Sequence, residues 1–388
     1  MKITITPIDP LISRDSRPFG QGQGTRIRSL DWLTPSVVCG ALRTGVGKLH
    51  GSFDPEALKA IEVRGPFLEY EGTLYFPRPL DFVTEQSFND DGGKNDGKKK
   101  KSVSGYAVRP LQEWKTLGET DLPFSGLQPA CVENPPDQDF KPKATPYFWS
   151  AAAMNRWLFG KDPKSFSLKE SECLSGPAKD ERIHVSIEPQ TGASEDARLF
   201  STTGLDFRVK RGGEISQMTA VIDADTQEDN YKQHLERICR SPELRPLGGE
   251  RRLAEWRGAK DSEGWRLSRK PDNATRLRMV LATPGIFSKG WLPGWIDEKL
   301  EGKIPGTSIE ARLVSAVLDR WEPVSGWNYE KGKNGPKPLR RMVPAGSVYF
   351  FEVVGKQPFD WETLWLRSVC DDEQDKKDGF GSALWGIW

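Results

Sequence analysis

The sequence contains the same short pattern twice, once near its start and once in its second half. Residues Met1–Thr6 alternate between apolar and polar side chains and precede Pro7, and residues Thr275–Thr283 alternate in the same way before Pro284. Alternation with a period of two predicts a β-strand in each place. A serine followed by a basic residue comes next in both copies, as Ser13-Arg14 and as Ser288-Lys289.

The two copies also close alike, each with a helix-like stretch, a loop marked by glycine and a strand-like stretch. These segments are Tyr231–Arg240, Pro246–Gly249 and Arg251–Trp256 in the first copy, and Trp361–Cys370, Asp378–Gly381 and Ser382–Trp388 in the second. An internal duplication at this level predicts two similar domains. A chain of 388 residues also exceeds the size at which a single core usually stops growing. We therefore expect an α+β protein with one domain over residues 1–270 and another over residues 271–388.

Several segments between the repeated ends have clear patterns. Thr34 followed by Pro35 predicts the start of a helix that continues to Leu49. Arg43 and Lys48 lie on the polar side of that helix and are candidates for contact with RNA. Alternation over Arg182–Phe207, with a turn at Gln190-Thr191-Gly192, predicts a hairpin. In the second half, Ala311–Trp321 and Arg341–Val354 have the character of strands. This order of elements is that of a β-α-β-β-α-β unit built twice.

Residues 50–180 are the least regular part of the sequence. Proline recurs through this region, and Asn89–Gly105 contains Asp-Asp-Gly-Gly and a run of four lysines, Lys98–Lys101. We expect an irregular insertion here, in which Asn89–Gly105 is solvated or disordered. A basic arm that touches nucleic acid is the alternative.

Charge and cysteine content limit the class of protein. The net charge is +1, so any polyanion must be bound by a local site and not by a global positive field. The five cysteines are odd in number and have no CxxC spacing, which argues against a disulfide framework and against a zinc site. We find no pattern typical of a cofactor site, a signal peptide or a membrane span, and we expect a cytoplasmic location.

Two basic, glycine-rich segments are candidates for contact with phosphate. The first runs from Arg14 and Arg17 through Gly20, Gly22 and Gly24 to Arg26 and Arg28. The second contains Gly248, Gly249, Arg251 and Arg252. Exposed amides and guanidinium groups can reach the same phosphate oxygens. A mobile surface loop with solvated arginines is the alternative for the first segment.

Gly379 and Gly381 stand in the place that corresponds to the second segment, so we treat them as candidates too, with a tight turn before a buried strand as the alternative. The 14 tryptophans could stack on bases, but most are expected to be core or interface anchors.

Catalysis has little support in the sequence. The three histidines are far apart in the chain, and no triad, metal-binding or paired-carboxylate spacing is present. His184 is the best candidate for a general base in metal-independent RNA cleavage, because it lies on the polar face of a predicted hairpin strand. A satisfied surface histidine is the alternative.

In their order along the chain, these features resemble the RAMP superfamily, and within it the family of the third subunit of Cmr-type (type III-B) CRISPR effector complexes. The most specific parts of the resemblance are Asp9–Phe19 and Arg182–Pro189. It covers most of the chain, apart from Asn89–Gly105 and the poorly patterned region around it.

The resemblance implies two fused ferredoxin-like (RRM-like) domains with long insertions. It further implies a non-catalytic, RNA-binding role in antiviral defence: the subunit binds the repeat-derived 5′ segment of the guide RNA (crRNA), docks the large polymerase-like subunit and contacts a neighbouring RAMP backbone subunit. Residues placed near guide phosphates or flipped bases by the resemblance are Arg14, Arg17, Arg43, Gly248, Gly249 and Arg251. A RAMP-type guide-processing endonuclease, which would place His184 or His50 beside the scissile phosphate, and a scaffold that contacts only protein remain as alternatives.

Overall fold

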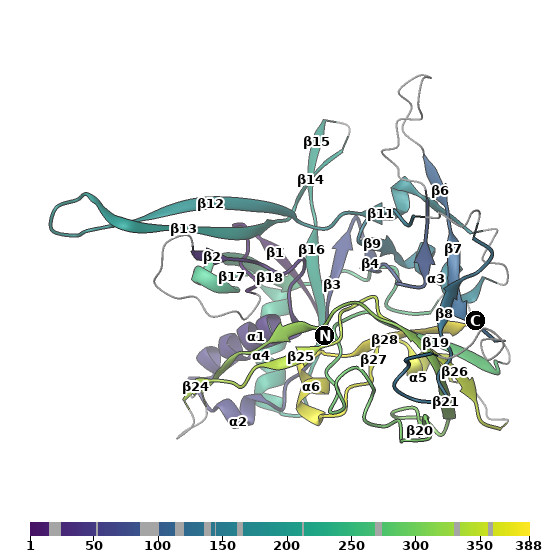
Figure 1. Cartoon of the computed structure of the whole chain (residues 1–388). Helices are drawn as coiled ribbons and strands as arrows, with labels where there is room; N and C mark the ends of the chain where they lie inside the picture. The colour runs from purple at the N-terminus through teal and green to yellow at the C-terminus, as the bar shows by residue number, and fades with distance from the viewer. Residues whose placement is uncertain are drawn as a thin grey trace, which may run out of the picture.

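The protein consists mainly of β-strands, arranged in two large antiparallel sheets with short helices and smaller ribbons around them (Figure 1). The described part of the chain contains six α-helices, so the expected α+β class is confirmed. None of these helices is both long and apolar enough to cross a membrane. The computed structural model describes residues 1–14, 25–51, 53–85, 101–112, 120–135, 141–143, 145–160, 166–211, 213–267, 274–329, 334–355 and 360–388.

The first large sheet has eight strands and is built mainly from the first half of the chain. Its central strand β1 (Lys2–Pro7) lies between β16 and β18, and the alternation predicted for this segment is seen in the burial of Ile3 and Ile5. In spatial order the strands are β11 (Cys173–Leu174), β9 (Phe148–Ser150), β4 (Thr73–Pro77), β3 (Glu62–Tyr70), β16 (Thr219–Asp225), β1, β18 (Leu253–Gly258) and β17 (Glu243–Pro246).

Helices α1 (Pro35–His50) and α4 (Asp229–Arg240) cover one face of the first sheet. Thr34 stands at the N-cap position of α1 and Pro35 is its first residue, as the sequence predicts. Val38, Leu42 and Val46 of α1 and Leu235 and Ile238 of α4 are completely buried in the cluster beneath. The short α2 (Pro55–Leu58) follows α1 and is capped by Asp54, whose side chain accepts hydrogen bonds from the Glu56 and Ala57 amides.

The second large sheet has six strands and comes from the C-terminal part of the chain. The central strand β19 forms from the predicted Thr275–Thr283 segment, and β28 from the predicted C-terminal strand. In spatial order the strands are β20 (Glu301–Lys303), β21 (Glu310–Val317), β26 (Val348–Val353), β19 (Arg276–Leu281), β28 (Ser382–Ile387) and β27 (Arg367–Ser368).

The helices of the second half are shorter than the sequence predicts. The expected helix over Trp361–Cys370 stops after α5 (Trp361–Leu364), because Leu366 has a left-handed backbone conformation with φ of 58° and leads into β27. A separate helix, α6 (Glu373–Asp378), starts at the Asp372 cap and ends at Gly379. Among the described residues between β19 and β20 there is no helix that matches α1 of the first half.

The region over residues 50–180 is more regular than expected. Besides β3, β4, β9 and β11 it contains α3 (Ala151–Phe159), which is buried along most of its length. Aromatic rings from Phe82, Trp149, Trp157 and Phe166 pack together beside α3. Residues 86–100 of the predicted insertion lie outside the described residues. The smaller strands are β5 (Phe82–Val83), β6 (Ser102–Ser104), β7 (Tyr106–Pro110), β8 (Ala130–Val132) and β10 (Ser167–Lys169).

The two sheets share one hydrophobic core. Phe67 and Phe76 of the first sheet lie in the same cluster of buried side chains as Met279 and Phe351 of the second. The helices α1 and α4 cover the opposite side of the first sheet, where a second cluster is buried. Both faces of the first sheet are therefore covered by protein around these residues, and its interaction sites must lie at loops, edges and projecting hairpins.

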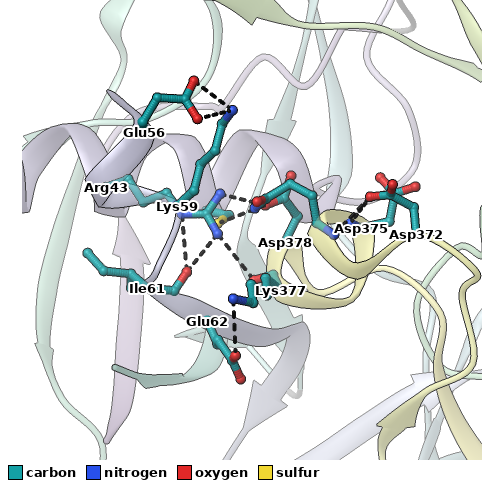
Figure 2. A network of polar contacts seen from close by, with 11 residues as sticks. Arg43, Glu56, Lys59, Ile61, Glu62, Asp372, Asp375, Lys377 and Asp378 are labelled. Atoms are coloured by element: carbon teal, nitrogen blue, oxygen red, sulfur yellow. Dashed lines mark hydrogen bonds and ion pairs between the residues drawn. The ribbon is translucent and has the colours of Figure 1, made fainter. Parts of the chain in front are cut away.

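Buried charges also join the two halves. The Arg43 guanidinium of α1 contacts the Asp378 carboxylate at the end of α6 at 2.5 Å, and it donates further hydrogen bonds to the carbonyls of Ile61 and Lys377 (Figure 2). Deeper inside, Asp81 contacts Arg278 of β19 at 2.6 Å, and both side chains are completely buried. These pairs fix the C-terminal sheet against the N-terminal half.

Candidate RNA-binding surface

The segment that follows β1 is held firmly against the hairpin predicted over Arg182–Phe207. Leu11 and Leu205 exchange two backbone hydrogen bonds, of 3.0 and 2.7 Å. The next residues run beside Ser29 and Leu30, because the Leu30 amide donates to the Ser13 carbonyl at 2.8 Å and Arg14 forms a bridge with Ser29. The exposed Arg14 side chain therefore starts from an ordered backbone.

The glycine loop at residues 248–249 packs directly on this segment. The Gly249 amide donates a hydrogen bond of 2.8 Å to the Ile12 carbonyl. Gly248 has a φ of +74°, and a Cβ added there would lie 2.5 Å from the same Ile12 oxygen. Its ψ is −160°, so both this backbone conformation and the close approach require glycine at position 248. The backbone that approaches these glycines is therefore that of Ile12 in this chain.

Four arginines lie exposed around the joined segments. They are Arg14, Arg26, Arg28 and Arg251, and we refer to them as the N-terminal basic surface. Arg26 belongs to β2 (Thr25–Ile27), which pairs with β13 (Ser194–Asp206). Arg252 is only partly exposed, and its guanidinium contacts the Glu250 carboxylate at 2.7 Å. Guanidinium groups that project from a fixed backbone suit contact with phosphate oxygens.

The predicted hairpin is present as β12 (Ala178–Ile187) and β13 (Ser194–Asp206), and it projects far from the body of the protein (Figure 1). His184 lies opposite Phe200 in the register, and its ring stacks on the Phe200 ring at 5.0 Å with an angle of 14° between the planes. His184 Nε2 also lies 2.8 Å from the Thr202 hydroxyl. His184 is thus a satisfied, half-exposed residue of the hairpin.

The sequence analysis missed Arg182, which connects the hairpin to the basic surface. Its exposed guanidinium contacts the Asp180 carboxylate at 2.7 Å. The hydrogen bond that Arg182 donates to Asp180 is the main cause of a raised pKa of Arg182, and smaller contributions come from the charges of Asp9 and Glu250. Asp9 precedes the Leu11–Arg14 segment and Glu250 lies in the glycine loop, so charges of the basic surface region act on Arg182. Alternation with His184 along the predicted strand was the signal that could have identified it.

Arg43 and Lys48, the two candidate RNA-binding residues on α1, do not belong to the N-terminal basic surface. Arg43 is engaged by Asp378, and only 12% of its side chain is exposed, so we leave it out of the proposed interface. Lys48 is exposed, but it lies thirteen residues after Pro35, the first residue of α1. This corresponds to about 20 Å along the helix axis. The helical segment therefore separates these two residues from the N-terminal basic surface.

Gly379 and Gly381 are also separate from that surface, because both are buried. A Cβ at Gly379 would lie 2.5 Å from the Gly65 carbonyl oxygen of β3, and one at Gly381 would lie 2.6 Å from Cys370 Sγ. The structure thus has the tight turn before a buried strand that was the alternative for these glycines, and we leave both out of the proposed interface. Arg17, Gly20, Gly22 and Gly24 lie outside the described residues.

Most tryptophans have structural positions, as expected. Trp149, Trp256 and Trp385 are among the largest fully buried side chains, whereas Trp321 and Trp327 are about half exposed. No described set of three or more His, Cys, Asp and Glu side chains is placed to hold a metal ion.

Comparison with known proteins identifies the family. The model of the family described as CRISPR-associated protein (Cas_Cmr3) matches residues 3–388. No protein of curated function matches the sequence. Among solved structures, a chain of the type III-B Cmr-beta complex bound to cognate target RNA is 14% identical, with 90% of this chain and 86% of that chain covered and a TM-score of 0.48.

The same type III-B complex bound to target RNA and AMPPnP contains a chain that is 13% identical, with 90% of this chain and 86% of that chain covered and a TM-score of 0.47. A chain of the Csm3-Csm4 subcomplex of a type III-A CRISPR-Cas interference complex is also 13% identical, with coverages of 92% and 94% and a TM-score of 0.38. The family match spans nearly the whole chain and confirms the resemblance found in the sequence motifs. The chain belongs to the Cas_Cmr3 family of CRISPR-associated proteins.

Proposed function

We propose that this protein is the subunit of a type III-B CRISPR effector complex that holds the repeat-derived 5′ end of the guide RNA and docks the large polymerase-like subunit. Membership of the Cas_Cmr3 family supports the type of complex. The finer assignment rests on the N-terminal basic surface. In this proposal the subunit is non-catalytic and also contacts a neighbouring RAMP backbone subunit.

The observation that carries the proposal is the packing of the glycine loop on the Leu11–Arg14 segment. The hydrogen bond between Gly249 and Ile12 joins two basic segments that are more than 200 residues apart in the sequence. It places Arg251 and Arg14 on neighbouring, ordered backbones with exposed side chains. A polyanion with regularly spaced phosphates can be held by such a pair, while the nearby amides allow close approach.

The topology of the sheets supports a site at loops and not on a sheet face. We propose that each large sheet derives from a ferredoxin-like unit, because β3-β16-β1-β18 and β21-β26-β19-β28 both have the spatial order of such a unit. RRM domains bind single-stranded RNA on the open sheet face. Here Phe67 and Phe76 of that face lie in the core shared with the second sheet. This favours binding of RNA at the connecting segments, where the basic surface lies.

The apolar side of the long hairpin is a candidate for protein contact. Ile183, Val185, Ile187 and Leu199 are between 45% and 74% exposed. Exposed apolar side chains in one stripe favour an interface with another subunit. This agrees with a subunit whose affinity for RNA is shared across an assembly.

The endonuclease alternative has no specific observation in its favour. His184 Nε2 is within hydrogen-bond distance of Thr202, and its ring is stacked on Phe200. These contacts account for the histidine without a reacting phosphate. We therefore propose no cleavage reaction for this chain.

The test is to assemble the complex with an Arg251→Gln subunit and to measure the retention of guide RNA at increasing salt. We expect weaker retention, and a slope of log affinity against log salt that is shallower by about 0.7 for one lost contact with single-stranded RNA. Arg240→Gln is the matched control, because Arg240 is exposed on α4 and pairs only locally with Glu236, at 2.9 Å.

Two outcomes would overturn the proposal. If Arg14→Gln and Arg251→Gln together leave RNA retention and its salt slope unchanged, the subunit is a scaffold that contacts protein. If the isolated chain cuts repeat RNA in the absence of metal, and His184→Ala abolishes the cut, it is a nuclease. Sequencing of the 5′ ends of co-purified RNA distinguishes a repeat-derived guide from unspecific RNA.

A further inference from the structure

The C-terminal half of the protein contains a two-stranded ribbon that connects β21 to β26. We call it the C-terminal ribbon, and it extends from the second sheet toward α2 (Figure 1). The first strand pairs with the last and the second with the third. In chain order these strands are β22 (Glu322–Val324), β23 (Trp327–Asn328), β24 (Gly335–Pro336) and β25 (Arg340–Met342).

One face of the C-terminal ribbon packs on the body of the protein. Val324 and Met342 are buried, and Arg340, which lies opposite Val324 in the register, contacts the Asp375 carboxylate at 2.8 Å. Successive side chains of a strand point to opposite faces. Arg341, between Arg340 and Met342, therefore points to solvent, and its side chain is exposed.

The solvent side of the ribbon carries large aromatic side chains together with arginines. Trp321, Trp327 and Tyr329 are 46%, 53% and 60% exposed. The Arg341 guanidinium lies over the Trp321 ring, 4.9 Å from its centroid, and the neighbouring Arg320 is exposed as well. Neither guanidinium has an ion-pair partner among the described residues. Both positive charges are thus available to a ligand.

The rings of Trp327 and Tyr329 are held in place by their neighbours. Trp327 Nε1 donates a hydrogen bond of 2.8 Å to the Asn334 side chain. The Tyr329 ring packs against Phe53 at 6.1 Å, with an angle of 89° between the planes. Side chains two residues apart on an extended strand emerge on the same side, about 6.6–7 Å apart. The strand therefore presents two consecutive aromatic rings, as platforms for successive bases do.

The position of the ribbon favours RNA over protein as the ligand. Tryptophan, tyrosine and arginine also occur at the centre of protein interfaces. However, Leu30 packs against the cluster that contains Val324 and Met342, and it lies only two residues after Arg28 of the N-terminal basic surface. A polyanion bound by that surface can continue onto the ribbon without leaving the protein. Exposed rings beside unpaired cations match the two needs of a single strand, which are base stacking and phosphate contact.

We propose that the C-terminal ribbon binds single-stranded RNA, with Trp327 and Tyr329 stacking on bases and Arg320 and Arg341 contacting phosphates. Binding of this kind tolerates any sequence, because every base has a flat face on which a ring can stack. The proposal extends the proposed RNA-binding function, but it rests on residues outside the N-terminal basic surface. Guide and target RNA share the chemistry that the ribbon recognises.

The experiment measures binding of a fluorescent, unstructured RNA of about 12 nucleotides to the purified full chain at increasing salt. Trp327→Ala and Tyr329→Ala should each weaken binding about fivefold or more, because each removes one stacked base. The slope of log affinity against log salt should stay unchanged for these two variants, whereas Arg341→Gln should make it shallower by about 0.7. Trp327→Phe should recover part of the affinity, because the ring is kept.

These slopes distinguish the ribbon from the N-terminal basic surface. If Arg14→Gln and Arg251→Gln have no effect while Trp327→Ala weakens binding, the N-terminal surface fails as the RNA site and the ribbon stands. If Trp327→Ala and Tyr329→Ala bind RNA as tightly as the unchanged protein, the proposal for the ribbon is overturned, whatever the arginine variants do.

Leu339→Ala is the matched control within the ribbon, because Leu339 is 58% exposed and has no ring. It should leave the affinity for RNA unchanged. If Leu339→Ala and Trp327→Ala both weaken assembly with the other subunits, and neither weakens RNA binding, the ribbon is a protein interface and the proposal is wrong. In the assembled complex, ultraviolet cross-linking with either labelled guide or labelled target identifies the strand that touches the ribbon, and a cross-link to neither also overturns the proposal.

Discussion

The Arg43 guanidinium of α1 and the Asp378 carboxylate of α6 form a largely buried ion pair between the two halves of the chain, with a separation of 2.5 Å (Figure 2). Only 12% of each side chain is exposed. Arg43 also donates to the Ile61 carbonyl, and Gln374 donates to Asp378 at 2.7 Å, so the pair is fixed from both sides. The residue that the family resemblance placed near RNA thus has a structural partner 335 residues away.

Arg43→Ala should destabilise the protein strongly. It leaves the Asp378 carboxylate and the Ile61 carbonyl buried without their main donor, and breaking a buried pair typically costs about 3–5 kcal/mol. Residual exposure lowers our expectation to about 2–4 kcal/mol, measured by urea denaturation. Arg43→Lys should recover part of the loss, because a lysine keeps the charge but cannot make the forked contact.

The control for this prediction is Lys59→Ala, which removes an ion pair with Glu56 shown in the same view (Figure 2). Glu56 is 62% exposed, so the change should stay within about 0.5 kcal/mol. Equal losses for Arg43→Ala and Lys59→Ala would show that the Arg43 contact does not join the two halves.

Local patterns in the sequence were sufficient to predict several elements of the structure. The predicted strand Met1–Thr6 is β1 at Lys2–Pro7, and the predicted helix Thr34–Leu49 is α1 at Pro35–His50. The predicted hairpin is also present, with β12 paired to β13 and a positive φ at Gly192. It could be predicted because the alternation and the turn at Gly192 are both local signals. The link between the glycine loop and Ile12 could not be predicted in the same way, since it depends on how β1 and β18 pair.

Other features depend on contacts that no local pattern shows. Helix α3 has apolar residues on most sides because it is buried between sheets, so it lacks the one-sided stripe by which a helix is recognised. The role of Arg43 depends on Asp378 in the other half, and the meeting of His50 with His234 depends on the packing of α1 against α4. These positions follow from the tertiary structure and not from sequence spacing.

Gly248→Ala should disturb the proposed RNA-binding surface as well as stability. The backbone at position 248, with φ of 74° and ψ of −160°, lies in a region essentially restricted to glycine, and such strain costs a non-glycine residue about 1–3 kcal/mol. At position 248 the new Cβ would also lie 2.5 Å from the Ile12 oxygen, so the loop must move away from the Leu11–Arg14 segment. We expect a loss of stability larger than the conformational cost alone, and weaker guide retention in the assembled complex.

Gly192→Ala separates these two effects. Gly192 has a similar φ of +68°, but no atom lies within 4 Å of an added Cβ. It should therefore show only the conformational cost. Equal effects of the two substitutions on stability and on RNA retention would mean that the close approach to Ile12 has no influence on the surface.

Asp81→Asn should destabilise the protein because it removes the only negative charge in direct contact with Arg278 among the described residues. Both side chains are completely buried, and Asp81 also contacts Arg109 at 2.7 Å and accepts from the Trp157 indole at 2.8 Å. The Arg278 charge would remain in the interior, over the Trp157 ring, without its carboxylate. We expect a loss of about 3 kcal/mol or more at pH 7, measured by urea denaturation.

The same substitution should change how stability depends on pH. Burial alone would raise the pKa of Asp81, but Arg278 and Arg109 outweigh it and hold the pKa below its ordinary value. The unfolded chain therefore takes up a proton at this residue near pH 3.9, before the folded protein does. The stabilisation by Asp81 is complete above about pH 5 and is lost as the pH falls through about 3.9 and below.

The difference in stability between the original protein and Asp81→Asn should thus be constant from pH 7 to about pH 5 and become smaller below pH 4. Asp261→Asn is the control, because Asp261 contacts Lys2 but is 79% exposed, and its loss should change stability little at any pH. A constant difference down to pH 3 would show that the pKa of Asp81 is not lowered in the folded state, and that Arg278 is stabilised by other groups.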